Sequence, residues 1–105
     1  MADIMKILQQ AQQMQGRLQE IQDELQKRTV VGSAGGGMVS AEADGKGELR
    51  KIRIDASVVD PNDVEMLEDL VMVAVSDAQK KAAALAQEEM GKLTGGLDLP
   101  FRLPI

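Results

Sequence analysis

A regular apolar repeat over residues 4–25 constrains the fold of this chain more than any other feature. Its members recur at alternating spacings of three and four residues, which is the heptad pattern of a helix that packs along another helix. The repeat consists of Ile4, Ile7, Ala11, Met14, Leu18, Ile21 and Leu25. It predicts a helix over 4–28, with Asp3 as N-cap and with Lys27 and Arg28 at the end where a helix dipole favours cations.

Such a helix is too long for a compact domain of this size. At roughly 1.5 Å per residue it spans about 37 Å, whereas the radius of gyration of a compact chain of 105 residues is about 13 Å. The helix must therefore project beyond its own sheet and leave part of its apolar stripe in water. A second helix of the chain can cover some of the stripe, and a second copy can cover more. We therefore expect a homodimer, with the stripe as core and dimer seam.

Three short strands are expected in the middle of the chain. Two glycine-rich turns separate segments in which apolar and polar residues alternate. The expected strands cover about 29–34, 38–44 and 48–55. Leu49 is out of phase with Ile52 and Ile54, and a β-bulge near Arg50 would reconcile them. These features predict a three-stranded antiparallel sheet with one covered face.

A second long helix is expected over 61–91. Asp60 fits an N-cap and Pro61 fits the first helical position. Its apolar stripe contains alanines that allow close approach to a neighbour: Met66, Leu67, Leu70, Val71, Ala74, Ala78, Ala82 and Leu85. Residues 92–105, rich in glycine and proline, are expected to be a flexible tail. The prediction is a single α+β domain over 1–91, in the order α-β-β-β-α.

Composition argues against an enzyme. The chain has neither histidine nor cysteine, so the usual neutral base, the thiol nucleophile and most transition-metal sites are excluded. Clustered carboxylates such as Glu88 and Glu89 fit a solvated helix face, and the glycine run 35–37 fits a flexible turn better than a phosphate loop. We expect no metal and no cofactor. No apolar run is long enough for a signal peptide or a membrane span, so we expect a cytoplasmic protein.

Charge alone does not decide the partner. The net charge of −5 opposes non-specific adhesion to nucleic acid. Basic residues nevertheless form small clusters, including 27–28, 50–53 and 80–81. Each cluster also fits an ordinary solvated surface. Phe101 is the single aromatic residue, so a base-stacking platform for single strands is lacking.

Several segments in combination resemble the YbaB/EbfC family of nucleoid-associated DNA-binding proteins. They are SAGGGMV (33–39), DGKGEL (44–49), IRID (52–55), VEMLEDLV (64–71), AVSDAQKK (74–81) and MGKLTGGL (90–97). The resemblance covers essentially the whole chain. It implies a bacterial protein of the nucleoid, built as a dimer with a joined sheet. Its protruding helices would be arranged like tweezers and would bind duplex DNA with little or no strict sequence requirement.

The resemblance assigns DNA contact to the arm helices rather than to a signature motif. On that basis the candidate phosphate contacts are Lys6, Arg17, Lys80, Lys81 and Lys92. They would position the protein without reading bases. The alternative is a protein-interaction adaptor whose helical arms or methionine-rich surface clasp a protein partner. Membrane and small-molecule partners are not expected.

Overall fold

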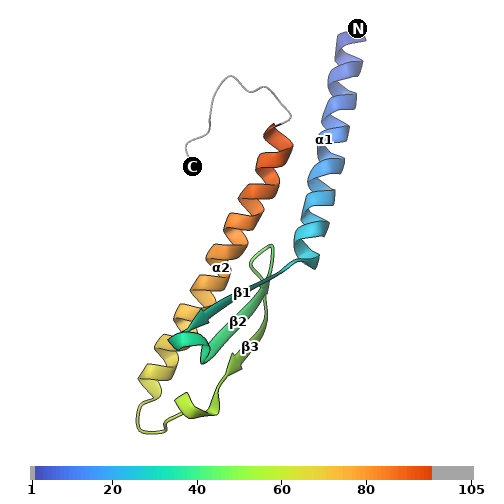
Figure 1. Ribbon diagram of the computed structural model, residues 1–105. Helices are drawn as coiled ribbons and strands as arrows, with labels where there is room; N and C mark the ends of the chain where they lie inside the picture. Colours follow the sequence, from blue (N-terminus) through green and yellow to red (C-terminus); the bar gives the residue numbers. More distant parts are fainter. Residues whose placement is uncertain (1, 96–105) are drawn as a thin grey trace.

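The computed structural model describes residues 2–95 and confirms the predicted α-β-β-β-α order (Figure 1). The long helices are α1 (Ala2–Lys27) and α2 (Val64–Gly95), and the strands are β1 (Thr29–Ala34), β2 (Val39–Asp44) and β3 (Leu49–Ile54). Two short 3-10 turns, η1 (Gly35–Gly37) and η2 (Ala56–Val58), follow β1 and β3. The strands form one sheet in the order β1-β2-β3, antiparallel throughout.

The predicted bulge lies where the phase of the apolar residues placed it. Glu42 pairs with Lys51, but the next residue of β2, Ala43, pairs with Leu49. Arg50 is therefore the extra residue of β3. The bulge brings Leu49 onto the same face as Ile52, as the sequence pattern required.

The covered face of the sheet packs against α2. β2 contributes the buried residues Val39, Ala41 and Ala43, and α2 contributes Ala74, Ala78 and Ala82. Because these side chains are small, the helix and the sheet approach closely, most of all at Gly32 of β1. A Cβ atom there would overlap backbone atoms of Ala74 and Ala78, so this crossing requires glycine.

The second helix begins three residues later than the sequence predicted. Pro61 and Asn62 form a turn, and the Asp60 side chain accepts the N–H of Asn62 at 2.9 Å instead of capping the helix. Asp63 is the cap, because its Oδ1 accepts the N–H of Met66 at 3.2 Å. Both acids fit the same capping pattern, which explains the misplaced start.

Both long helices also differ from expectation at their other boundaries. α1 begins at Ala2, so Asp3 lies in its first turn rather than at its N-cap, and it ends at Lys27. α2 runs to Gly95, so residues 92–95, expected in the tail, are helical. The rest of the expected tail, 96–105, lies outside the described residues.

Asp44, the last residue of β2, organises the turn between β2 and β3, and this turn contacts the end of α1. The Asp44 side chain is 2% exposed and accepts the N–H groups of Lys46 and Glu48 at 2.9 and 3.0 Å and the Arg50 guanidinium at 2.8 Å. Burial alone would raise the pKa of Asp44, but these three donors together hold it below its usual value. The N–H of Gly45 then donates to the carbonyl of Leu25 at 2.8 Å, which fixes the end of α1.

The molecule is elongated, as the length of the heptad repeat predicted. It measures 72 × 25 × 16 Å, with a radius of gyration of 19.7 Å. Burial of the stripe on α1 decreases toward the N-terminus: Leu25 is 5% exposed, Met14, Leu18 and Ile21 are half-buried, and Ile4 and Ile7 are 61% and 62% exposed. The far half of α1 therefore extends beyond α2 (Figure 1). Within one protomer the stripe is only partly covered.

Candidate nucleic-acid interface

Two of the five predicted cations lie on α1, Lys6 on its projecting half and Arg17 just past its middle. Lys6 and Arg17 are eleven residues apart, close to three full turns, so they share one face at a spacing of about 17 Å. The same face carries Gln10 and Gln13 between them, which are neutral hydrogen-bonding groups. Both cations are exposed, and neither forms an ion pair with a described residue. This face flanks the apolar stripe without interrupting it.

The adjacent lysines of α2, Lys80 and Lys81, are in different environments. Lys80 is exposed beside an open hollow lined by Ser33, Ser76 and Asp77, and it has no ion pair among residues 2–95. The Lys81 ammonium lies 3.2 Å from Asp77 Oδ2 and donates to the backbone carbonyl of Val31 at 3.0 Å. Lys81 is therefore held by its own protomer.

Asp77 and Lys81 together close the outer edge of β1. The N–H of Ser33 donates to Asp77 Oδ2 at 3.1 Å, while the carbonyl of Val31 accepts Lys81. The hydrogen bond from the Ser33 N–H and, to a smaller extent, the bond from the Lys81 ammonium lower the pKa of Asp77. The carboxylate therefore stays charged at neutral pH. We call Asp77 and Lys81 the β1 clamp. It occupies backbone groups that an added strand would need.

The opposite edge of the sheet, β3, is open. No group outside the sheet binds its outer backbone among the residues described. Leu49, Ile52 and Ile54 face the same side as the buried residues of β2, yet they are 39%, 43% and 41% exposed because α2 covers only β1 and β2. β3 therefore combines free hydrogen-bonding groups with an uncovered apolar surface.

The fifth predicted cation, Lys92, belongs to a small charged cluster where α1 meets α2. Its ammonium lies 3.2 Å from Glu89 Oε1, and the Arg28 guanidinium approaches the same oxygen at 3.9 Å. Glu89 thus links the end of α1 to α2, and the charge of Lys92 is partly compensated within the protomer.

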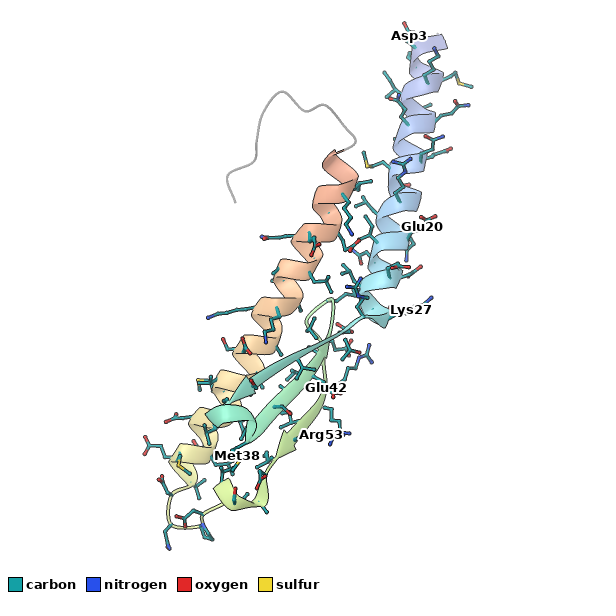
Figure 2. All side chains as sticks on the ribbon, in the orientation of Figure 1. Asp3, Glu20, Lys27, Met38, Glu42 and Arg53 are labelled. Atoms are coloured by element: carbon teal, nitrogen blue, oxygen red, sulfur yellow. The ribbon has the colours of Figure 1, made fainter. Side chains whose placement is uncertain are left out.

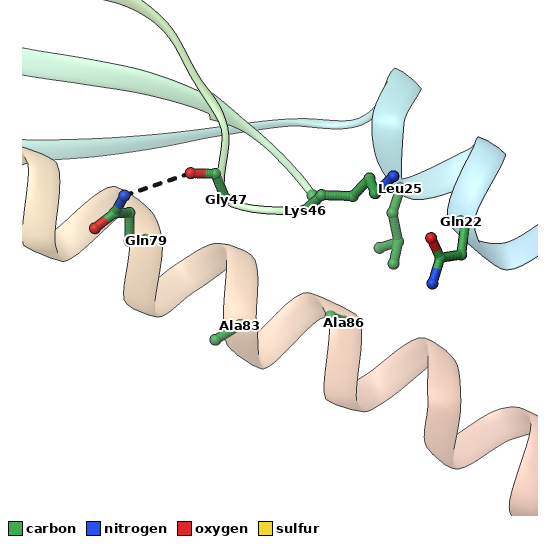
Figure 3. Close-up of a pocket in the computed structure, with 8 residues that line it drawn as sticks. Gln22, Leu25, Lys46, Gly47, Gln79, Ala83 and Ala86 are labelled. Atoms are coloured by element: carbon green, nitrogen blue, oxygen red, sulfur yellow. Dashed lines mark hydrogen bonds between the residues drawn. The ribbon is translucent and has the colours of Figure 1, made fainter.

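A cleft of about 490 Å³ separates the end of α1, the turn after β2 and α2 (Figure 3). Gln22, Leu25, Lys46, Gln79 and small residues line it, and the Gln79 amide donates to the carbonyl of Gly47 at 3.4 Å. This lining contains no carboxylate to pair with Lys46 and no hydroxyl or thiol side chain. Over the described part of the chain, no group of three metal-ligating side chains comes together.

Several features of this surface left little trace in the sequence. The bond between Ser33 and Asp77 joins residues 44 positions apart, and nothing local in either segment indicates it. Lys81 looked equivalent to Lys80 because the two are adjacent. For Gly32, the available signal was a lone glycine within a strand pattern.

Among residues 2–95, neither long helix combines the length with the low polarity that a membrane-spanning segment needs.

Comparison with known proteins identifies the relatives of this chain. The profile of the YbaB/EbfC DNA-binding family matches residues 1–97. A nucleoid-associated protein of Gemmatimonas aurantiaca is 57% identical over 102 residues, covering 97% of this chain and 98% of its own length. One from Desulfotalea psychrophila is 46% identical over 98 residues, covering 93% and 92%. Another from Paramagnetospirillum magneticum is 49% identical over 106 residues, covering 99% of each chain.

A solved structure shares the fold. An uncharacterized protein from Helicobacter pylori aligns with a TM-score of 0.69 at 24% identity, over 87% of this chain and 91% of its own. At that identity the likeness concerns architecture alone. The overall fold is therefore shared with a protein whose sequence is largely different.

Proposed function

The chain belongs to the YbaB/EbfC DNA-binding family, and from this premise we propose that it acts as a homodimer that binds duplex DNA through its helical arms. The binding has little sequence specificity and takes place in the cytoplasm, on the nucleoid, where it influences nucleoid organisation and gene expression. The role is architectural rather than enzymatic.

The observation that carries the proposal is a set of exposed cations on the two long helices that form no ion pair, although the charge of Lys80 also acts on nearby Asp77. Lys6, Arg17 and Lys80 have no carboxylate partner within ion-pair distance among residues 2–95, although the protomer carries a net charge of −5. A cation without an internal partner can neutralise a DNA phosphate and release a counterion. Lys81 and Lys92 contribute less, because part of their charge is already taken up by Asp77 and Glu89.

The proposed contacts imply weak, salt-sensitive binding. Lys6 and Arg17 have long, exposed side chains suited to contacting phosphates rather than to reading base edges. The glutamines between them can add only polar contacts to phosphate or sugar. Few phosphates are neutralised per protomer, and the acidic surface elsewhere repels DNA. Two protomers double the number of cations, so dimerisation raises the affinity.

The second protomer joins at β3. The β1 clamp occupies one edge of the sheet, whereas β3 offers free backbone groups beside the apolar residues Leu49, Ile52 and Ile54. Pairing two β3 strands would extend the sheet and cover these side chains. In this arrangement the dimer seam lies at β3, whereas the exposed part of the stripe, around Ile4 and Ile7, which the heptad repeat alone placed in the seam, lies on arms that project from the joined sheet.

One observation favours a second candidate function. The projecting end of α1 exposes four large apolar side chains, Ile4, Met5, Ile7 and Leu8. A helix with such a face can dock into a groove of another protein. In that case the dimer is a protein-interaction adaptor, and its acidic surface serves solubility.

The test compares two sets of cations. Duplex DNA carrying a fluorophore is titrated with wild type, with the double variant Lys6→Gln/Arg17→Gln, and with Lys92→Gln as control. The double variant removes four arm cations per dimer, so the slope of log affinity against log salt should become shallower by up to about 3.6. Lys92→Gln should change it by less than about 1 per lysine removed, because Glu89 already pairs with Lys92.

Absence of saturable binding by the wild type at the lowest salt would refute the DNA proposal and favour the adaptor. Binding with equal slopes for wild type and the double variant would show that DNA contacts lie elsewhere than on α1. Both arm residues are exposed, so the variants should fold normally, and circular dichroism checks this.

A further inference from the structure

β3 is the most basic element of the chain. It carries Arg50, Lys51 and Arg53 and no acid in six residues, whereas α2 carries six acids and three bases. Arg50, on the bulge, is engaged by Asp44 and lies 3.7 Å from Glu48. Lys51 and Arg53 have no ion-pair partner in the described range. Two uncompensated positive charges therefore stand close together on this strand.

Both charges point to the face of the sheet that α2 does not cover. Lys51 pairs with Glu42 and Arg53 with Ser40, while the intervening Ile52 pairs with the buried Ala41. Side chains alternate along a strand, so Lys51 and Arg53 share the uncovered face and lie about 7 Å apart. Figure 2 shows Glu42 and Arg53 on the side of the sheet away from α2.

We propose that this uncovered face is a second DNA-contact surface, in which Lys51 and Arg53 of both protomers bind the phosphate backbone. The inference rests on the proposed function, because the four charges come together only when two protomers join at β3. Neighbouring strands lie about 4.8 Å apart, which would bring all four cations into one compact patch at the centre of the dimer.

The energetics of such a patch favour a polyanionic ligand. Like charges that face each other across neighbouring strands destabilise a sheet. Glu42, half-buried on each protomer, is the acid opposite Lys51, and it forms no ion pair with Lys51 within 4 Å. Glu42 therefore offsets part of the charge of Lys51 without forming an ion pair, and the repulsion among the remaining positive charges is relieved when phosphates cover them. The rest of the face carries hydroxyl groups, such as those of Ser33 and Ser40, which can donate to phosphate oxygens.

An ordinary alternative exists for basic residues on an edge strand. Lysines there can serve to prevent unwanted strand pairing. On that explanation, neutralising Lys51 and Arg53 would enlarge the particles in solution and leave DNA binding unchanged. The two explanations therefore predict different results for the same variant.

The experiment measures affinity for a fluorescent duplex against salt for the full-length protein. The variants are Lys51→Gln/Arg53→Gln and Glu42→Gln, with Lys46→Gln as control because Lys46 lies on the turn beside the cleft. The double variant should bind about tenfold more weakly at low salt, with a slope reduced by between about 1 and 4. Glu42→Gln should bind more tightly, and Lys46→Gln should match the wild type. Light scattering verifies that each variant keeps the wild-type mass.

Four outcomes decide the proposal. Weaker DNA binding by Lys51→Gln/Arg53→Gln together with tighter binding by Glu42→Gln, both at unchanged particle mass, supports it. If wild type binds but both face variants bind like it, the second surface is refuted while the function of the arms stands. Larger particles with an unchanged slope would establish edge protection instead. If the wild type fails to bind at any salt, the proposed function itself fails, and this inference fails with it.

Discussion

Replacing Gly32 with alanine should force α2 away from the sheet. The added methyl group would overlap the backbone N of Ala78 and the backbone O of Ala74, and it would lie 2.8 Å from Ala78 Cα. These atoms belong to the middle of a long helix and cannot rotate away as a side chain can. Either the helix or the strand must therefore shift as a unit.

The size of the effect follows from that shift. To restore ordinary van der Waals distances, α2 and β1 must move apart by roughly 1 Å. A gap of that width around the new methyl group removes about a quarter to a half of the dispersion attraction between the helix and the sheet. Overpacking of a core typically lowers the free energy of unfolding by about 1–3 kcal/mol. Because Gly32→Ala creates two clashes with backbone atoms, we expect a loss at or above the upper end of that range, about 3 kcal/mol. For a domain of this size that lowers the melting temperature by roughly 12–24 °C. Calorimetry at fixed protomer concentration measures it.

The matched control is the same substitution at Gly16. No atom lies within 4 Å of a Cβ built there, and the residue is exposed within α1. Alanine favours a helix over glycine by about 1 kcal/mol, so Gly16→Ala should stabilise the protein slightly. The two substitutions should have opposite signs. A Gly32→Ala variant as stable as wild type would refute the close packing of α2 on β1.

Three further perturbations test other parts of the structure. Because the pKa of Asp44 is lowered in the folded state, its contribution to stability is present above the unfolded pKa of about 3.9 and is lost as pH falls through the lower folded value. Acid unfolding followed by circular dichroism should show Asp44→Asn less stable at pH 7 and less pH-dependent below pH 4; curves parallel to wild type would contradict this. The double variant Asp77→Ala/Lys81→Ala opens the β1 edge and should produce species larger than a dimer in light scattering, whereas an unchanged mass would mean that the clamp does not control assembly. Ile52→Asp places a charge in the proposed β3 seam and should halve the mass; a persistent dimer would place the seam elsewhere.

Features with a local signal could be predicted from the sequence. The heptad repeat specified the long first helix and its projection, because periodicity and length are properties of the segment itself. The phase of Leu49 relative to Ile52 required a bulge, and the structure has it at Arg50. The family was identified from several segments in combination, and the family profile confirms it.

Features that depend on distant contacts could not be predicted in the same way. Asp60 and Asp63 fit the cap of α2 equally well by sequence, and the fold of the intervening turn selects Asp63. Lys80 and Lys81 are chemically alike, but only Lys81 reaches the carbonyl of Val31. That Lys6, Arg17 and Lys80 contact phosphate stays a prediction, because exposed cations without an ion pair fit a phosphate contact and an ordinary solvated surface alike.

The most direct test of the central proposal is the salt dependence of wild-type binding to duplex DNA. Fluorescence anisotropy at a series of salt concentrations gives the affinity at each. Saturable binding should weaken linearly in log affinity against log salt, with similar slopes for duplexes of unrelated sequence. No saturable binding at the lowest salt would contradict the proposed DNA binding, and a slope near zero would show that phosphate contacts do not drive the interaction.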